Sequence, residues 1–275
     1  AGLKALADRL PGALYRGVEV ADLDRDALVL GLLRERFDDW QAKGYIPSRR
    51  IVPGYNTDQP IRERGWTHWH HLFTPRQLLM HGFMLSQAER ASPSTAPMID
   101  LLLAVARTAN WDSKLCQWGT GAARESISQT FYNQALNTLL NYPTKGLRLL
   151  WNNAGIQHEV IGISGRSDVG AGDARTSKER CDFWLTDPPY ADAINYHELS
   201  EFFLAWYEKH LPRLFPEWSA DSKRALAIRG SGKGFREGMV DAYRNLAAHM
   251  PDNGMQIVMF THQDAGVWAD LSMIL

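Results

Sequence analysis

The feature that most restricts how this chain can fold is a short apolar run that ends at two consecutive prolines. Residues 181–186 read as a buried β-strand, and the chain continues directly into Asp187-Pro188-Pro189-Tyr190. Proline has no amide hydrogen and cannot continue a central strand, so the strand ends here. A second apolar run at residues 255–261 follows a turn at residues 251–254 and predicts another strand.

Helical patterns lie before these strands and between them. Thr74 is a suitable N-cap and Pro75 suits the first helical position, so a helix should run from Pro75 to about residue 90. Short apolar strands that alternate with helices predict an α/β fold around a mainly parallel sheet, in which ligands bind at the carboxyl ends of the strands. We expect a helical and irregular accessory region at residues 1–65 and an incomplete α/β domain at residues 66–275. Further helices are expected over residues 97–108, 126–140, 196–210 and 235–250.

The composition is that of a globular protein. Hydrophobic residues make up 45% and charged residues 22% of the 275 residues, which excludes a mainly disordered chain. Lys and Arg number 30 against 31 Asp and Glu, so the net charge argues neither for nor against a nucleic-acid partner. Two cysteines cannot build a disulfide framework. No apolar run approaches the ~20 residues of a membrane span, and we expect a cytoplasmic protein with no membrane partner.

Asp187-Pro188-Pro189-Tyr190 resembles the amine-methylating loop of S-adenosylmethionine-dependent methyltransferases. The alternative is a turn that only terminates a strand. An exocyclic amine on a base is a poor nucleophile, because its lone pair is conjugated into the ring. The resemblance implies that Asp187 and the Pro188 carbonyl accept the N–H bonds of the amine and aim its lone pair. Pro189 helps to stiffen the loop, and Tyr190 stacks on a base turned out of the duplex.

Further segments are similar to the large adenine-specific DNA methylases found beside restriction and anti-phage genes. The similarity covers residues 45–275 and implies part of a Rossmann-like methyltransferase sheet with an added helical N-terminal region. It implies transfer of a methyl group from S-adenosylmethionine to N6 of adenine in DNA. The implied partners are DNA and other subunits of a restriction or defence system. The similar segments are Gly65-Trp66, residues 72–79, residues 128–131, Asn195-Tyr196, residues 198–203, residues 259–262 and Trp268.

Two segments are candidates for binding the cofactor. In the resembling enzymes the Asp of a Gly-Asp-Ala loop lies near the adenine amine of the cofactor, which indicates Asp173 and Ala174 in this sequence. Phe73, Thr74 and Pro75 resemble the helix-opening Thr-Pro that lines the cofactor pocket of adenine methylases. The simpler interpretations are a generic turn at Asp173 and a helix cap at Thr74.

The glycine-rich cofactor loop of the family does not occur in this sequence. The nearest glycine clusters, at residues 119–121 and 230–234, do not follow a convincing strand. The sequence also begins without methionine and stops within an apolar stretch. We therefore expect an excerpt of a longer protein whose cofactor loop lies upstream. By itself, the chain is expected to bind S-adenosylmethionine weakly or not at all.

Other chemistries receive less support. His68, His70 and His71 lie close together but lack a fourth ligand at a helical spacing, so we expect no metal site. Cys116 and Cys181 are not preceded by proline, as the nucleophile of cytosine carbon methylation is in resembling enzymes. Two alternatives to adenine methylation stay open. One is N4 methylation of cytosine in DNA, and the other is a catalytically silent nucleic-acid-binding subunit of a defence complex.

Overall fold

The chain divides into two compact units. The computed structural model describes residues 17–91, 95–116, 128–132, 162, 164–189, 195–218, 221–222, 226–228 and 232–275. The first unit comprises Ala1–Glu159 and Glu198–Ser222, and the second comprises Val160–His197 and Lys223–Leu275. The chain thus leaves the first unit, returns to it and leaves it again. This division does not follow the boundary expected at residue 65.

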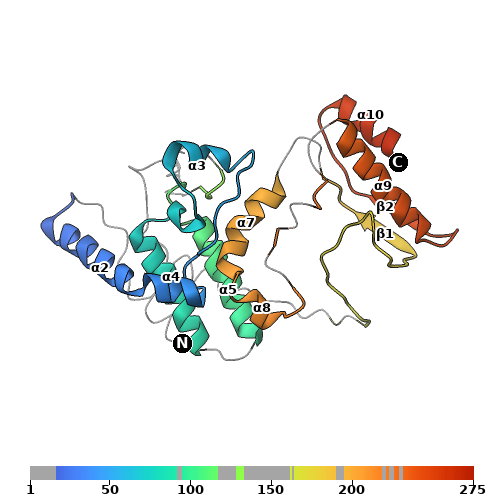
Figure 1. Ribbon diagram of the computed structural model, residues 1–275. Helices are drawn as coiled ribbons and strands as arrows, with labels where there is room; N and C mark the ends of the chain where they lie inside the picture. The colour runs from blue at the N-terminus through green and yellow to red at the C-terminus, as the bar shows by residue number, and fades with distance from the viewer. Residues whose placement is uncertain are drawn as a thin grey trace. The chain divides into compact units, whose positions relative to one another are not determined.

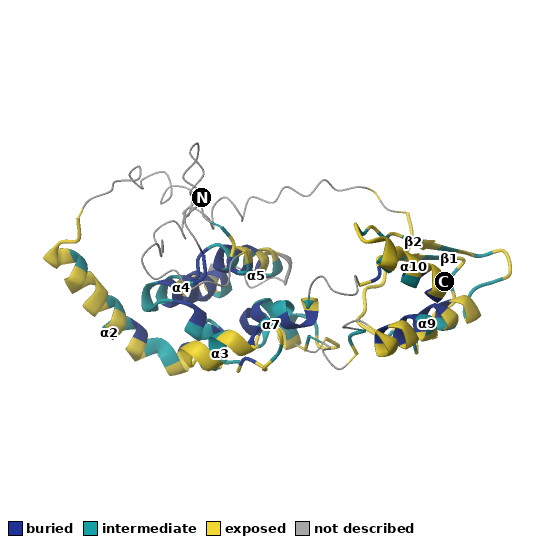
Figure 2. Cartoon of the chain, turned by 90° about the horizontal axis from the view of Figure 1, so that it is seen from above, coloured by how far each residue is buried: buried dark blue, intermediate teal, exposed yellow. Residues whose placement is uncertain are grey.

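Helices build the described part of the first unit (Figure 1). Helix α4 contacts both α2 and α5. Figure 2 shows buried residues along α4 and α7, whereas the first half of α2 is exposed. The helices are α2 (Val20–Lys43), α3 (Asp58–Arg64), the 3-10 helix η1 (Trp69–Leu72), α4 (Pro75–Ala91), α5 (Thr95–Asn110), most of α7 (Tyr196–Tyr207), and α8 (Leu211–Leu214).

The core of the first unit is aromatic. Phe73 and Phe202 are stacked with their ring centroids 5.8 Å apart, and Trp206 meets Phe73 edge-on at 5.2 Å. All three side chains are buried. Aromatic side chains bury a large apolar area at preferred angles, and α7 contributes two of these three rings. The apolar stripe of α7 therefore joins the segment before α4.

The second unit contains a two-stranded parallel sheet. Strand β1 (Phe183–Thr186) pairs with β2 (Met255–Val258), with Phe183 opposite Met255 and Thr186 opposite Val258. Helix α9 (Lys233–Ala248) covers one face of this sheet, where Trp184 and Val258 pack against its buried residues. Helix α10 (Ala265–Ile274) packs on α9 and contributes Ile274 to the same core.

The other face of the sheet carries apolar side chains that are exposed in the described structure. Parallel sheets normally have both faces buried, which explains why these strands read as nearly continuous apolar runs rather than alternating ones. The exposed side chains are Phe183, Leu185, Met255, Ile257 and Met259.

The structure confirms both expected strands and most expected helices, and a mixture of helices with a parallel sheet is compatible with the α/β class. The helix expected over residues 126–140 is wrong at residues 128–132, which form a turn. Both the backbone N–H and the Oγ1 hydroxyl of Thr130 donate to the Asn110 carbonyl, at 2.7 and 2.8 Å, and these bonds compete with helical ones. The rest of that expected helix lies outside the described residues. Among the described helices, none has the length and apolar character needed to cross a membrane.

Candidate active site at the carboxyl edge of the sheet

The predicted substrate loop begins where β1 ends. Met259 N donates to Thr186 O at 2.8 Å, so strand pairing continues to the last residue of β1. Asp187 follows and is exposed, whereas Pro188 is buried and Pro189 is exposed. Within the described ranges, no hydrogen bond or ion pair engages the Asp187 carboxylate. Its two oxygens can therefore accept N–H bonds from a bound molecule.

Helix α9 fixes the end of β1. The hydroxyl groups of Thr186 and Tyr243 form a hydrogen bond of 3.1 Å. Burial raises the pKa of Tyr243, so its phenol stays neutral at physiological pH. Because Thr186 precedes Asp187 directly, this bond limits the movement of the backbone that carries the carboxylate.

An aromatic cluster lies at the corresponding end of β2. Phe260 meets Trp268 edge-on with 5.2 Å between centroids and stacks on His262 at 6.5 Å. Trp268 Nε1 donates to the His262 carbonyl at 2.9 Å, and Asp264 caps α10 by accepting from Gly266 N at 2.6 Å. Trp268 is 43% exposed. Phe260, His262 and Trp268 belong to the segments that resemble the methylase family, and their only other signal in the sequence is a pair of aromatic residues after a strand.

The predicted cofactor residue Asp173 has its carboxylate occupied. Arg175 donates from Nε to both oxygens and from Nη2 to Oδ2, at 2.7 to 3.0 Å, and its backbone N–H donates to Oδ1 at 2.9 Å. These hydrogen bonds are the main cause that lowers the pKa of Asp173. The Asn245 amide of α9 donates to the carbonyls of Ala174 and Ser177, both at 2.9 Å. Asp173 can reach a cofactor amine only by giving up a contact with Arg175.

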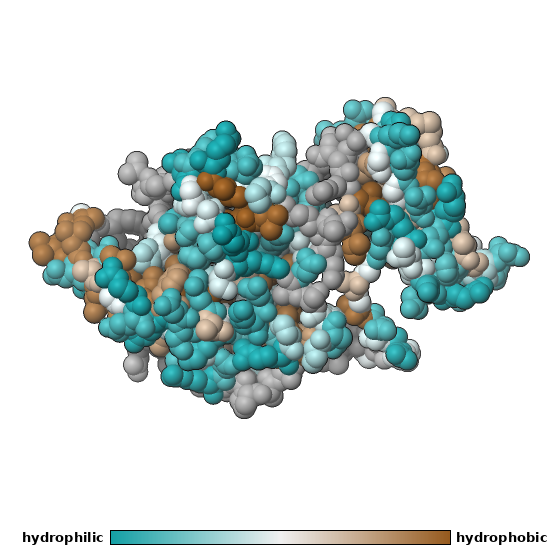
Figure 3. Space-filling model, in the orientation of Figure 1, coloured by the Kyte–Doolittle hydropathy of each residue, from teal (hydrophilic) through white to brown (hydrophobic). Residues whose placement is uncertain are grey.

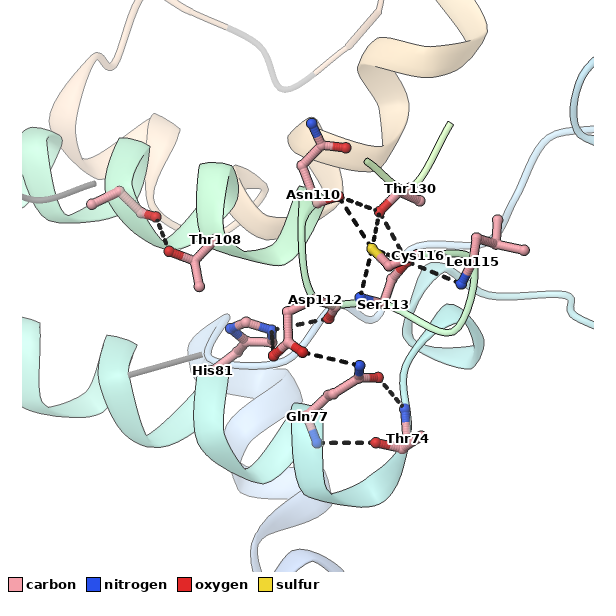
Figure 4. Close-up of polar contacts among 11 residues, drawn as sticks. Thr74, Gln77, His81, Thr108, Asn110, Asp112, Ser113, Leu115, Cys116 and Thr130 are labelled. Carbon is pink, nitrogen blue, oxygen red and sulfur yellow. Dashed lines mark hydrogen bonds and ion pairs between the residues drawn. The ribbon is translucent and has the colours of Figure 1, made fainter. Parts of the chain in front are cut away.

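The other predicted cofactor segment caps α4 (Figure 4). Thr74 N donates to Gln77 Oε1 at 2.8 Å, and Gln77 N donates to Thr74 Oγ1 at 3.2 Å, which is a reciprocal capping box. Gln77 Nε2 continues to Asp112 Oδ1 at 3.2 Å. Phe73 is buried in the aromatic core, and Pro75 occupies the first turn of α4. The structure therefore confirms the interpretation of Thr74 as a helix cap.

The structure does not group all the predicted residues. The segments that contain Asp187 and Asp173 belong to the second unit and are both tied to α9, through Tyr243 and Asn245. Residues 73–75 belong to the first unit. Tyr190, the predicted stacking residue, lies outside the described residues.

The histidine cluster is a packed group rather than a ligand set. The ring centroids of His70 and His71 are 4.4 Å apart. Burial, followed by the nearby charge of His71, lowers the pKa of His70 to about 4. Across the described ranges, no group of three or more His, Cys, Asp or Glu side chains could hold a metal ion. Burial also raises the pKa of the Cys116 thiol, so this cysteine is a poor nucleophile.

Comparisons with protein families, with characterised proteins and with solved structures return no match for this chain. Any functional assignment therefore depends on the sequence motifs and on the geometry given above.

Proposed function

We propose that this chain carries the substrate-binding side of an S-adenosylmethionine-dependent DNA methyltransferase that acts on adenine N6. The proposal includes membership of the large adenine-specific DNA methylases and a Rossmann-like sheet of which β1 and β2 are two strands. It also includes DNA and further subunits of a restriction or defence system as partners.

One observation carries the proposal: Asp187 offers an exposed carboxylate, unpaired among the described residues, at the carboxyl end of a parallel strand. In α/β sheets this edge is where ligands bind. A carboxylate fixed there by strand pairing can accept an N–H bond from an exocyclic amine, and the Pro188 carbonyl supplies a second acceptor one residue later. Two acceptors on one amine withdraw its hydrogens from the ring plane. The nitrogen lone pair then becomes available for attack on a methyl group.

The residues proposed for the cofactor do not fit it as they stand. The Asp173 carboxylate already accepts hydrogen bonds from Arg175, and Phe73 is buried in the core of the first unit. We therefore propose that this chain binds the substrate amine, and that S-adenosylmethionine needs contacts beyond these residues. The face of the sheet opposite α9 carries exposed apolar side chains. This supports a larger domain around the sheet, because parallel strands are normally covered on both faces.

The test compares Asp187→Ala with Asp182→Ala in the complete gene product. Asp182 is also exposed, but it lies before β1 at the opposite edge of the sheet. Transfer of a labelled methyl group to DNA should fall ~10²-fold or more in Asp187→Ala, because one preorganised acceptor is lost, and should be unchanged in Asp182→Ala. Mass spectrometry of the DNA product distinguishes N6-methyladenine from N4-methylcytosine.

Wild-type turnover by Asp187→Ala contradicts the proposed role of Asp187. A complete gene product that neither binds S-adenosylmethionine nor methylates DNA indicates the catalytically silent subunit instead.

A further inference from the structure

Three cationic side chains of the first unit have no carboxylate partner among the described residues. Two of them, Arg50 and Arg64, are exposed, and neither side chain forms a hydrogen bond or an ion pair within the described ranges. The carboxylates of α3, Asp58 and Glu63, both pair with Arg62 at 3.6 Å, so they do not neutralise Arg64. Figure 3 shows that the surface over α3 is strongly hydrophilic in this view.

The third cation, Lys114, contacts only neutral groups in the part of the chain that the structure describes. Its Nζ donates to the His71 carbonyl at 2.9 Å and lies 5.2 Å from the centroid of the Trp66 ring. A carbonyl dipole and the face of an aromatic ring both stabilise a cation, but neither cancels its charge. Trp66 follows Arg64 by two residues, so Lys114 lies near the end of α3 that Arg64 closes.

A short antiparallel bridge connects Arg50 to the same surface. Arg50 lies opposite His68, and backbone hydrogen bonds of 2.9 and 3.1 Å flank the pair. In a pair that is flanked by such bonds and makes none of its own, the two side chains lie close together on one face. The rings of His68 and His71 are 5.5 Å apart. The bridge therefore brings Arg50 to the surroundings of Lys114.

The histidines of this surface add a hydrogen-bond donor and no negative charge. His71 Nδ1 accepts from Thr67 N at 3.1 Å, which assigns the ring proton to Nε2. The Nε2–H group has no acceptor among the described residues. Burial, followed by the charges of His68 and Lys114, lowers the pKa of His71. Both charges are positive, and no carboxylate of a described residue counteracts them.

We propose that this basic surface, formed by Arg50, Arg64, His68, His71 and Lys114, binds the phosphate backbone of DNA. Cations without counter-charges favour a ligand with several negative charges, because each phosphate that they neutralise releases a condensed counterion. The net charge of the whole chain is −1, so attraction of a polyanion must come from a local surface such as this one. Phosphate contacts fix the position of a duplex without reading its sequence. The choice of DNA over an acidic protein rests on the proposed function, in which DNA is the substrate.

The test measures binding of a short labelled DNA duplex of mixed sequence to the 275-residue chain by fluorescence anisotropy, at about 50 to 200 mM salt. No cofactor is added, so binding is measured apart from methyl transfer. In the double variant Arg50→Gln/Arg64→Gln, the dependence of log K on log salt should become less steep by about 2, because two phosphate contacts are lost. Affinity at about 0.1 M salt should fall roughly 10- to 100-fold.

The matched control is Arg25→Gln, which also removes the charge of one exposed arginine. Arg25 belongs to the first half of α2, and that end of the helix lies away from α3 in both views (Figures 1 and 2). This variant should keep the affinity and the salt dependence of wild type. Circular dichroism checks that all variants are folded, which is expected because the three arginines are exposed.

The proposal is overturned if the wild-type chain shows no salt-dependent binding of DNA, or if the double variant binds DNA as wild type does. Polyglutamate of matched charge is the competitor. If it displaces DNA at equal concentration of charge, the surface suits an acidic protein, and the proposal is also overturned. The proposed function fails separately: a complete gene product that binds DNA through this surface but transfers no methyl group contradicts that function and leaves the DNA surface in place.

Discussion

Asp173 and Asp187 carry the same functional group, yet their carboxylates are placed in opposite situations. Arg175 surrounds Asp173 with four hydrogen bonds, whereas the Asp187 carboxylate has no partner among the residues that are described. The sequence motifs indicated both positions. The motifs could not tell which of the two carboxylates is occupied. The bidentate pair of Asp173 with Arg175 depends on the path of the loop between them and not on composition. The role of Asp187 stays a prediction, supported by its exposure.

At the same scale, His70 predicts how stability depends on pH. Its pKa in the folded chain is about 4, below the ordinary value of about 6.5, mainly because burial penalises the charged ring. The unfolded chain therefore binds more protons between these values. The stabilising contribution is complete above pH 6.5 and is lost as the pH falls toward 4, by roughly 3 kcal/mol at most.

Urea unfolding between pH 7 and pH 4 measures this loss. His70→Gln keeps a donor for the Pro47 carbonyl, which His70 Nδ1 contacts at 3.0 Å, and should reduce the pH dependence. Part of the dependence should remain, because burial also lowers the pKa values of His71 and His210. His262→Gln in the second unit is the control and should leave the dependence in place. If His70→Gln keeps the full slope, another group titrates.

At the scale of elements, the start of α4 was predictable and its connections were not. Thr74, Pro75 and Gln77 form a local pattern whose capping geometry is set within four residues, so the sequence was sufficient. The bond from Gln77 to Asp112 spans 35 residues, and nothing local to either residue predicts it. The same contrast separates the predicted strands β1 and β2 from their pairing, which joins residues 72 positions apart.

The capping box yields a prediction that separates a structural role of Thr74 from a cofactor role. Thr74→Ala removes the Oγ1 acceptor of Gln77 N and should lower the free energy of unfolding by about 1 kcal/mol, whereas Thr74→Ser keeps the acceptor and should lie close to wild type. Chemical denaturation measures both variants. If Thr74→Ala is as stable as wild type, the cap at Thr74 contributes nothing to stability. The resemblance of Thr74-Pro75 to the wall of a cofactor pocket would then be the better explanation.

At the scale of the whole molecule, the chain crosses between its two units at residues 159–160, 197–198 and 222–223. Secondary-structure patterns cannot predict these crossings. The helix expected at residues 196–210 forms as α7, Tyr196–Tyr207, but the boundary between the two units falls inside it, after His197. Its apolar stripe was visible in the sequence, yet only the packing of Phe202 and Trp206 on Phe73 assigns that stripe to the first unit. Likewise, the apolar pattern of the strands does not tell which face of the sheet other segments cover and which face stays exposed.

Two separate cores predict two unfolding transitions. Leu85 on α4 is completely buried in the core of the first unit, and Leu246 on α9 is buried in the smaller core of the second. Leu→Ala at either buried position costs about 2–5 kcal/mol, enough to shift a transition by several degrees. In differential scanning calorimetry, Leu246→Ala should therefore lower only the transition of the second unit, and Leu85→Ala only that of the first. The second unit should unfold first, because its described core is smaller and one face of its sheet is exposed. A single transition that both substitutions lower equally would mean that the two cores unfold as one cooperative body.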